Sequence, residues 1–539
     1  MRHYAALFLA TFALLTPTLL GDAILWDDLY LVSSWSEDPM LQVEYFGKLG
    51  MPWQGWLHYA IHSIPNSIFL YKVLSILSWS CTSLIIFTLL KEVKRLTLKD
   101  RFIISLITTL FPGYNLWFSV IQMPQPLYIC IFFLGCYLYY DGYQKNGSIK
   151  KLLGLLLIIP TFALQSLYVF IYGLLSIWFW NTRDKKVGIV KSALTFSRKH
   201  WLVIVFPLVQ FVTLKSLFKV DQLFENYNLM QFDEVLLKLL MSFVMPVINI
   251  PRETWQSLST DPQLFIVIPF SIILVLPLII KSYRTSNSTE YDQDNGFWLT
   301  LFKAGLYLTI FALFPYALVD KPYLGIAYTG RFSMLLALPL SLIFYSSVKI
   351  LFANKRSLRA ASVGVICILF SFLTIKDQIL WQVRYIKYLS IVNQLRAEEP
   401  QSKLIFFQDE TSIGKPANLI YFELNWIMYQ AWGSKNHLGF SSFFKEKNPQ
   451  KLFLELEDRH YYSKLSNPFF QRLMLFESSA LPYYNTIASI IKIKEQTYYS
   501  NPKLWFAWVT GSNERKSQIL DHLVNIEVNE VQRKQHRQN

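Results

Sequence analysis

Two adjacent carboxylates, Asp27 and Asp28, are the side chains of this 539-residue chain that are best suited to carry chemistry. They lie in the segment GDAILWDDLY, residues 21–30, directly after an apolar run over residues 4–20. Carboxylates beside a membrane are costly to desolvate, so they usually face water, a metal or a substrate. They could instead cap a juxtamembrane helix. We therefore take Asp28 and Asp27 as catalytic candidates, with helix capping as the alternative.

An aromatic, amphipathic stretch over residues 45–59 follows the acid pair and predicts a helix in the membrane interface. Its tryptophans could stack on a sugar, although aromatic residues also gather at interfaces without a ligand. His58 and His62 have the spacing of a helical metal pair, which also occurs often without metal. The sequence therefore leaves open whether a divalent cation binds here. The candidate sugar or acceptor contacts are Trp26, Tyr30, Trp53, Trp56, His58 and Glu44.

Two cations in a later loop, Lys321 and Arg331, could hold a phosphate group. The planar guanidinium of Arg331 matches phosphate oxygens, and Lys321 would add a point charge. The alternative is anchoring to lipid headgroups. The sequence has no Walker A motif, no GxGxxG after a strand and no HExxH, so nothing in it supports a nucleotide-driven pump or a zinc protease.

The segments that position these residues are predicted to be membrane helices. Hydrophobic residues make up 53% of the chain and charged residues only 16%, against about 25% in soluble domains. Several apolar runs approach the roughly 17 to 25 residues that cross a bilayer. We interpret the long run 152–180 as two short helices that turn near Gln165. About eleven spans result, at residues 4–20, 66–90, 102–120, 127–140, 152–164, 166–180, 201–217, 263–280, 297–318, 332–350 and 359–375.

The formal charge of +15 has a topological explanation and does not indicate a nucleic-acid partner. Lys and Arg gather in alternate short connectors, which the positive-inside rule places in the cytosol. The first loop, residues 21–65, has six acids and one lysine and should face outward. The same alternation places loops 218–262 and 319–331 outside. Both Asn-x-Ser/Thr sequons fall in cytosolic connectors, which favours a bacterial plasma membrane.

The chain after the last predicted span has the composition of a soluble protein. Residues 403–407 and 487–493 are predicted strands, and residues 418–432 form a predicted amphipathic helix. We therefore expect two parts: a transmembrane catalytic domain over residues 1–375, and an extracytoplasmic α/β domain over residues 376–539.

This arrangement resembles the type C membrane glycosyltransferases. The resemblance rests on the acid pair in the first outer loop, the interfacial helices and the element Gly50-Met51-Pro52-Trp53, in which Met51 replaces the commoner Arg. In such families a first-loop carboxylate is the proposed base, and a basic residue in a later outer loop holds the lipid phosphate. The resemblance implies these roles for Asp28 or Asp27 and for Arg331, with Lys321 beside it.

The function implied is transfer of a sugar from a polyprenyl-phosphate donor to a hydroxyl of a glycan, lipid or protein acceptor, with inversion at the anomeric carbon. The good leaving group means that a base and a cation would suffice. One alternative is a transporter or flippase for lipid-linked glycans. Another is an O-antigen polymerase or ligase. The acids of the first loop favour the transferase, since a transporter does not require them.

Overall fold

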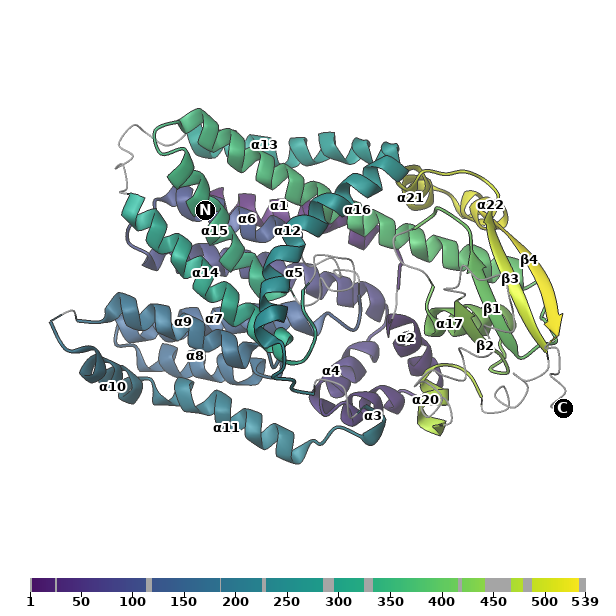
Figure 1. Ribbon diagram of the computed structural model, residues 1–539, viewed down its shortest axis with the longest axis horizontal. Coiled ribbons are helices and arrows are strands. Elements are labelled where there is room, and N and C mark those ends of the chain that lie inside the picture. The colour runs from purple at the N-terminus through teal and green to yellow at the C-terminus, as the bar shows by residue number, and fades with distance from the viewer. Residues whose placement is uncertain are drawn as a thin grey trace.

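The computed structural model describes residues 2–24, 27–112, 119–184, 186–224, 229–284, 295–323, 333–414, 419–441, 467–477 and 487–532. A helical bundle and a small C-terminal sheet lie side by side (Figure 1). The long helix α16 (Arg356–Leu395) begins in the bundle and extends to the sheet.

The bundle is built from apolar helices, which satisfy every backbone hydrogen bond within the segment. Its helices are α1 (Arg2–Leu20), α5 (Ser67–Leu89), α6 (Leu98–Leu110), α7 (Pro124–Gln144), α8 (Ser148–Thr161), α9 (Leu167–Thr182), α10 (Ile189–Lys199), α11 (Trp201–Leu217), α12 (Val235–Thr260), α13 (Val267–Arg284), α14 (Asn295–Leu318), α15 (Ala337–Leu351) and α16. Among the described residues, six helical segments are long and apolar enough to cross a membrane, or seven if the bent pair α10–α11 counts as one span.

The predicted runs and the observed helices correspond with some differences. A helix lies in each of the eleven runs, yet the count of eleven spans stays a prediction because several helices are short. Within the run 102–120, α6 ends at Leu110, because Phe111 precedes Pro112 and proline disfavours helix in the residue before it. The break between α8 and α9 falls at residues 162–166, so the predicted turn near Gln165 is present.

Three short helices form the first loop: α2 (Asp27–Glu37), α3 (Met40–Lys48) and α4 (Pro52–His62). Between α3 and α4 the chain turns at Gly50, whose φ is +74°. A Cβ there would lie 2.9 Å from the carbonyl oxygen of Phe218, so the turn needs glycine for both its conformation and its packing. Pro52 then occupies the first turn of α4, where a missing N–H costs nothing.

The C-terminal part contains a four-stranded mixed sheet in the order β2-β1-β3-β4. Strand β1 pairs in parallel with β2 and β3, and β3 pairs antiparallel with β4. The predicted strands at 403–407 and 487–493 correspond to β1 and β3, and the predicted helix to α17. The elements are β1 (Leu404–Asp409), α17 (Tyr421–Trp432), β2 (Leu438–Ser441), α20 (Pro468–Leu473), β3 (Ile487–Glu495), α21 (Asn501–Thr510), α22 (Asn513–His522) and β4 (Val524–Gln532).

The sheet and the first-loop helices share a hydrophobic core. From the first loop it contains Tyr30, Leu31, Leu41, Tyr45, Phe46 and Leu49. From the C-terminal part it contains Leu404, Phe406, Leu438, Phe469, Phe470, Leu473, Met474, Phe476 and Ala488. The predicted division between residues 375 and 376 falls inside α16, which continues without a break to Leu395. The C-terminal part is therefore joined to the bundle by a rigid helix and a common core.

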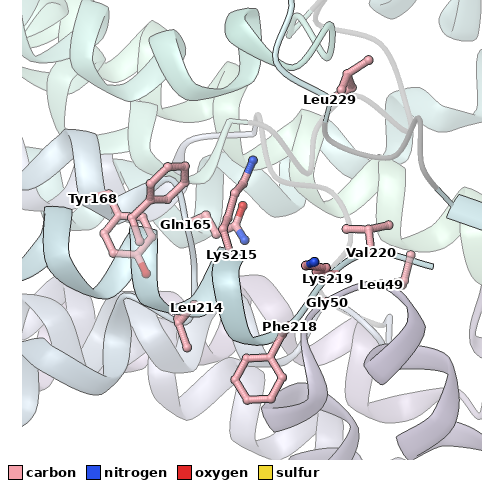
Figure 2. Close-up of a pocket in the computed structure, with 11 residues that line it drawn as sticks. Leu49, Gly50, Gln165, Tyr168, Leu214, Lys215, Phe218, Lys219, Val220 and Leu229 are labelled. Carbon is pink, nitrogen blue, oxygen red and sulfur yellow. The ribbon is translucent and has the colours of Figure 1, made fainter. Parts of the chain in front are cut away.

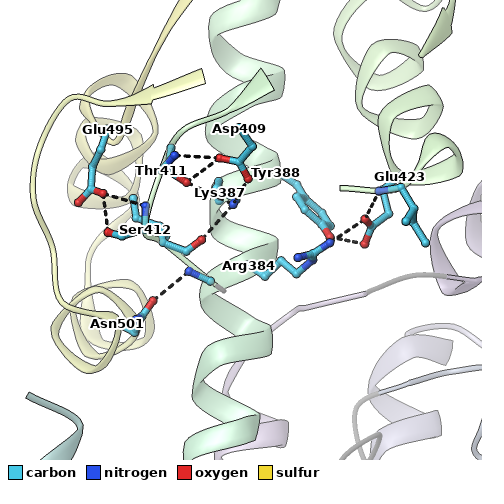
Figure 3. Close-up of polar contacts among 12 residues, drawn as sticks. Arg384, Lys387, Tyr388, Asp409, Thr411, Ser412, Glu423, Glu495 and Asn501 are labelled. Carbon is cyan, nitrogen blue, oxygen red and sulfur yellow. Dashed lines mark hydrogen bonds and ion pairs between the residues drawn. The ribbon is translucent and has the colours of Figure 1, made fainter. Parts of the chain in front are cut away.

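A buried polar network fixes α16 to the sheet layer (Figure 3). The guanidinium of Arg384 lies 2.8 Å from the carboxylate of Glu423, and neither side chain is more than 1% exposed. The Tyr388 hydroxyl and the backbone N–H of Ile420 also donate to this carboxylate. One turn further along α16, Lys387 lies 2.7 Å from Asp409 of β1. Both charged pairs are thus compensated where they are buried.

We predict that Glu423→Ala strongly destabilises the protein, because it leaves the buried Arg384 without its counter-charge. Breaking such a pair typically costs roughly 3–5 kcal/mol. The measurement is thermal unfolding of the detergent-purified protein, followed by tryptophan fluorescence. Glu527→Ala is the control, since Glu527 pairs with Lys494 at 2.6 Å on the exposed face of the sheet and should matter little. Equal melting temperatures for the two variants would contradict the assignment.

Candidate active site

Asp28, in the first turn of α2, is completely buried and its carboxylate accepts three hydrogen bonds. The backbone N–H groups of Val120 and Ile121 donate at 2.8 Å each, and the Ser119 hydroxyl donates at 3.1 Å. All three donors come from the short segment between α6 and α7. The predicted catalytic carboxylate is therefore held between the first loop and the segment just before α7.

Burial raises the pKa of Asp28 from 3.8 to about 7. Desolvation of the charged form is the largest cause, and the neighbouring Asp27 adds to it. The three hydrogen bonds act in the opposite direction, because they favour the ionised carboxylate. A carboxyl group of this pKa changes its protonation near neutral pH, which suits proton transfer in catalysis.

Lys72 is a second buried charge close to this carboxylate. Its side chain is 2% exposed on α5, and its ammonium group donates to the carbonyl oxygen of Gly21 at 2.5 Å. Asp22 and Asp28 both act on this ammonium group electrostatically. A Cβ on Gly21 would overlap the side chain of Gln382 from α16. The chain leaving α1 is thus confined between α5 and α16, and this confinement sets the approach to α2.

The two histidines of α4 are packed against α5. The Nδ1 atom of His58 lies 2.9 Å from the Tyr71 hydroxyl, and the imidazole stacks on Phe46 with centroids 4.9 Å apart. The His62 Nδ1 atom lies 3.2 Å from the Ser67 hydroxyl. Burial lowers the pKa of His58 to about 3 and that of His62 to about 4, so both rings are neutral at pH 7.

The other first-loop candidates have structural partners. Tyr30 is 2% exposed, and its hydroxyl donates to Tyr45 at 3.0 Å within the shared core. Glu44 accepts from Arg472 of α20 at 3.2 Å. Trp53 packs edge-on against Phe218, while Trp56 is 52% exposed. Sugar contacts by these four residues stay predictions, and Trp56 has the most accessible ring of them.

Two predicted site residues lie outside the described residues: Arg331 of the later loop and Trp26 of the first loop. Lys321 follows Asp320, whose carboxylate pairs with Lys238 of α12 at 2.9 Å. The backbone N–H of Tyr323 donates to Ser242 of the same helix at 3.0 Å. Residues 320–323 are thus held on α12, while the phosphate-binding role of Lys321 and Arg331 stays a prediction.

Among the residues that the structure describes, no group of three His, Cys, Asp or Glu side chains could hold a metal ion. Comparisons with known proteins add no further assignment. No protein-family model matches the chain, and no curated protein matches it.

Sequence reasoning missed two parts of this site. Lys72 had a usable signal, because a lysine within an apolar run is expensive in a membrane and usually functional. The contact of Asp28 with Ser119, Val120 and Ile121 had no signal in the sequence. It joins positions more than 90 residues apart, and its two strongest donors are backbone groups that any residue type provides.

We predict that Asp28 makes the protein less stable as pH rises from about 4 to 7. The folded state keeps a proton that the unfolded chain has lost in this range, so ionisation costs up to about 4 kcal/mol by pH 7. The melting temperature should decrease more between pH 5 and pH 8 in the wild type than in Asp28→Asn. Asp38→Asn, at a half-exposed carboxylate of the same loop, should keep the wild-type slope. An identical slope in Asp28→Asn would refute the raised pKa.

Proposed function

We propose that this protein is a membrane glycosyltransferase that moves a sugar from a polyprenyl-phosphate donor to an acceptor hydroxyl, with inversion. The observation that carries the proposal is the buried Asp28 carboxyl group, whose pKa of about 7 suits a general base. It is supported by the apolar helices of the bundle, which suit a lipid-linked substrate. A bacterial plasma membrane and an outward-facing site belong to the same proposal.

In this reaction the acceptor hydroxyl oxygen attacks the anomeric carbon while the bond from that carbon to the phosphate oxygen breaks. The phosphate leaves with the electron pair, and Asp28 takes the hydroxyl proton. The acceptor hydroxyl would replace the hydroxyl of Ser119, which makes the longest of the three contacts to Asp28. The backbone donors of Val120 and Ile121 would keep the carboxylate in place. Lys321 and Arg331 would stabilise the departing phosphate.

The alternatives are a transporter or flippase for lipid-linked glycans, and an O-antigen polymerase or ligase. A transporter would use the same apolar helices, and a proton-coupled one could also use a buried carboxyl group that titrates near neutral pH. The transfer assay with Asp28→Asn therefore decides between the two functions. Lys72 is buried and interacts electrostatically with Asp28. Buried ionisable groups in membrane proteins are usually functional, which favours chemistry over a purely structural role for Asp28.

We expect Asp28→Asn to lower sugar transfer by about 10²- to 10⁴-fold, the usual contribution of a general base. The measurement is transfer of radiolabelled sugar from a panel of polyprenyl-phosphate sugars by the purified protein in nanodiscs. Ser119→Ala is the matched control: it removes one contact to the same carboxylate and should stay within a few-fold of wild type. A transporter would be favoured if the wild type transferred sugar from none of the donors and Asp28→Asn still moved lipid-linked glycan across the membrane at the wild-type rate.

The pH profile gives a separate test. A base with a pKa near 7 must be ionised to accept a proton, so kcat/KM should rise about tenfold per pH unit below pH 7 and level off above it. The profile should be recorded between pH 5 and pH 9 with a saturating acceptor. A flat profile in a wild-type protein that transfers sugar would exclude Asp28 as the base.

A further inference from the structure

A cavity of about 250 Å³ lies away from Asp28, where the end of α11 meets the α3–α4 turn and the turn before α9 (Figure 2). Its walls are mainly apolar, and they include Tyr168, Phe211, Leu214, Phe218 and Val220. Leu49 and Gly50 close it on the side of the first loop. The cavity therefore joins the membrane bundle to the loop that carries the candidate base.

Two lysines give this apolar cavity a positive charge. Lys215 lies in the last turn of α11 and Lys219 follows the helix, and both line the cavity. Neither forms an ion pair with any residue that the structure describes, and Lys215 contacts only the ring of Phe211, at 5.2 Å. The nearest acid along the chain, Asp221, is already paired with Lys48 at 3.0 Å. Both lysines are exposed, so their charges are solvated. Two such cations beside apolar walls suit an anionic amphiphile.

A buried polar group in the wall also lacks a partner. Tyr168 is 6% exposed, and its hydroxyl has no hydrogen-bond partner among the described residues. The hydroxyl oxygen is closed to solvent, so it does not open into the cavity, and Tyr168 contributes its ring to the wall. The amide of Gln165 lies beside Lys215 in the same wall (Figure 2). The cavity thus offers the Gln165 amide as a neutral donor next to its charges.

The position of the cavity fits a headgroup at a membrane surface. Helix α11 has 17 residues, or about 25 Å of length, with Lys215 at its end. Before that end, Leu208, Val209 and Val212 are all more than half exposed. An alkyl chain leaving the cavity could follow this apolar face, while the phosphate stays at the lysines. The cavity itself is too small for a whole lipid, so it would hold only the headgroup and the first carbons.

We propose that this cavity binds the phosphate headgroup of an isoprenoid lipid phosphate, with Lys215 and Lys219 pairing with the phosphate. Identifying that lipid as the spent carrier rests on the proposed function, in which the phosphate of the reacting donor is held by Lys321 and Arg331. Lys321 is not among the residues that line this cavity. Two links hold it on the first loop: the backbone N–H of Asp221 donates to the carbonyl oxygen of Lys48, and Gly50 packs against Phe218.

The test is competition binding to the full-length protein in detergent, with a fluorescent polyprenyl phosphate as the probe. Farnesyl phosphate should displace the probe, whereas farnesol, inorganic phosphate and phosphatidylglycerol should each be at least tenfold weaker. The double variant Lys215→Ala/Lys219→Ala should weaken probe binding at least tenfold. Lys191→Ala, at an exposed lysine of α10, is the matched control and should bind as the wild type does.

A cavity-filling variant separates this site from lysines that merely contact headgroups. Leu214→Trp keeps both lysines but fills the cavity, so it should also weaken binding at least tenfold. Wild-type affinity in Leu214→Trp or in the double lysine variant would overturn the proposal. The proposal would also be overturned if inorganic phosphate or phosphatidylglycerol displaced the probe as effectively as farnesyl phosphate does. Because the assay needs no sugar transfer, the expected binding pattern without any transferase activity would refute the proposed function alone.

Discussion

Burial of charge at the junction of the bundle and the C-terminal sheet is the constraint on which the structure depends. Helix α16 is 40 residues long, and its last turns carry Arg384 and Lys387 with almost no solvent exposure. Such charges are tolerated only when a counter-charge and further hydrogen bonds compensate their desolvation. Both counter-charges, Glu423 and Asp409, come from the sheet layer. The far half of α16 can therefore be buried only if the sheet packs against it.

The same constraint separates a structural carboxylate from a reactive one. Asp409 and Asp28 are both largely buried, and desolvation raises the pKa of each. For Asp409 desolvation is also the largest single cause, but the charge of Lys387 and the hydrogen bonds from Lys387 and Thr411 together outweigh it, so the pKa is lowered. Asp28 has only neutral hydrogen-bond donors in direct contact, so desolvation dominates and the pKa rises. A carboxyl group that is buried without a contacting cation remains able to take up and release a proton near pH 7.

The sequence predicted the elements better than their contacts. Long apolar runs and strands such as 487–493 follow from local periodicity, which a single sequence displays. The end of α6 at Leu110 depends on Pro112 and was also readable, although the apolar run continues past it. The partners of Tyr30 were not readable. An aromatic residue near a membrane could face lipid, sugar or protein, and only the packing of β1, α17 and α20 against the first loop decides among them.

This shared core also bears on what the C-terminal part does. Tyr30 packs against Phe422, and Glu44 accepts from Arg472, so α17 and α20 cover part of helices α2 and α3. Asp28 lies in the first turn of that same α2. Loss of the sheet would uncover the inner face of α2 and leave Arg384 unpaired, and both changes would disturb the candidate base. The C-terminal part therefore supports the site mechanically, and a role in choosing the acceptor would have to lie on its exposed face, where substitutions leave this core intact.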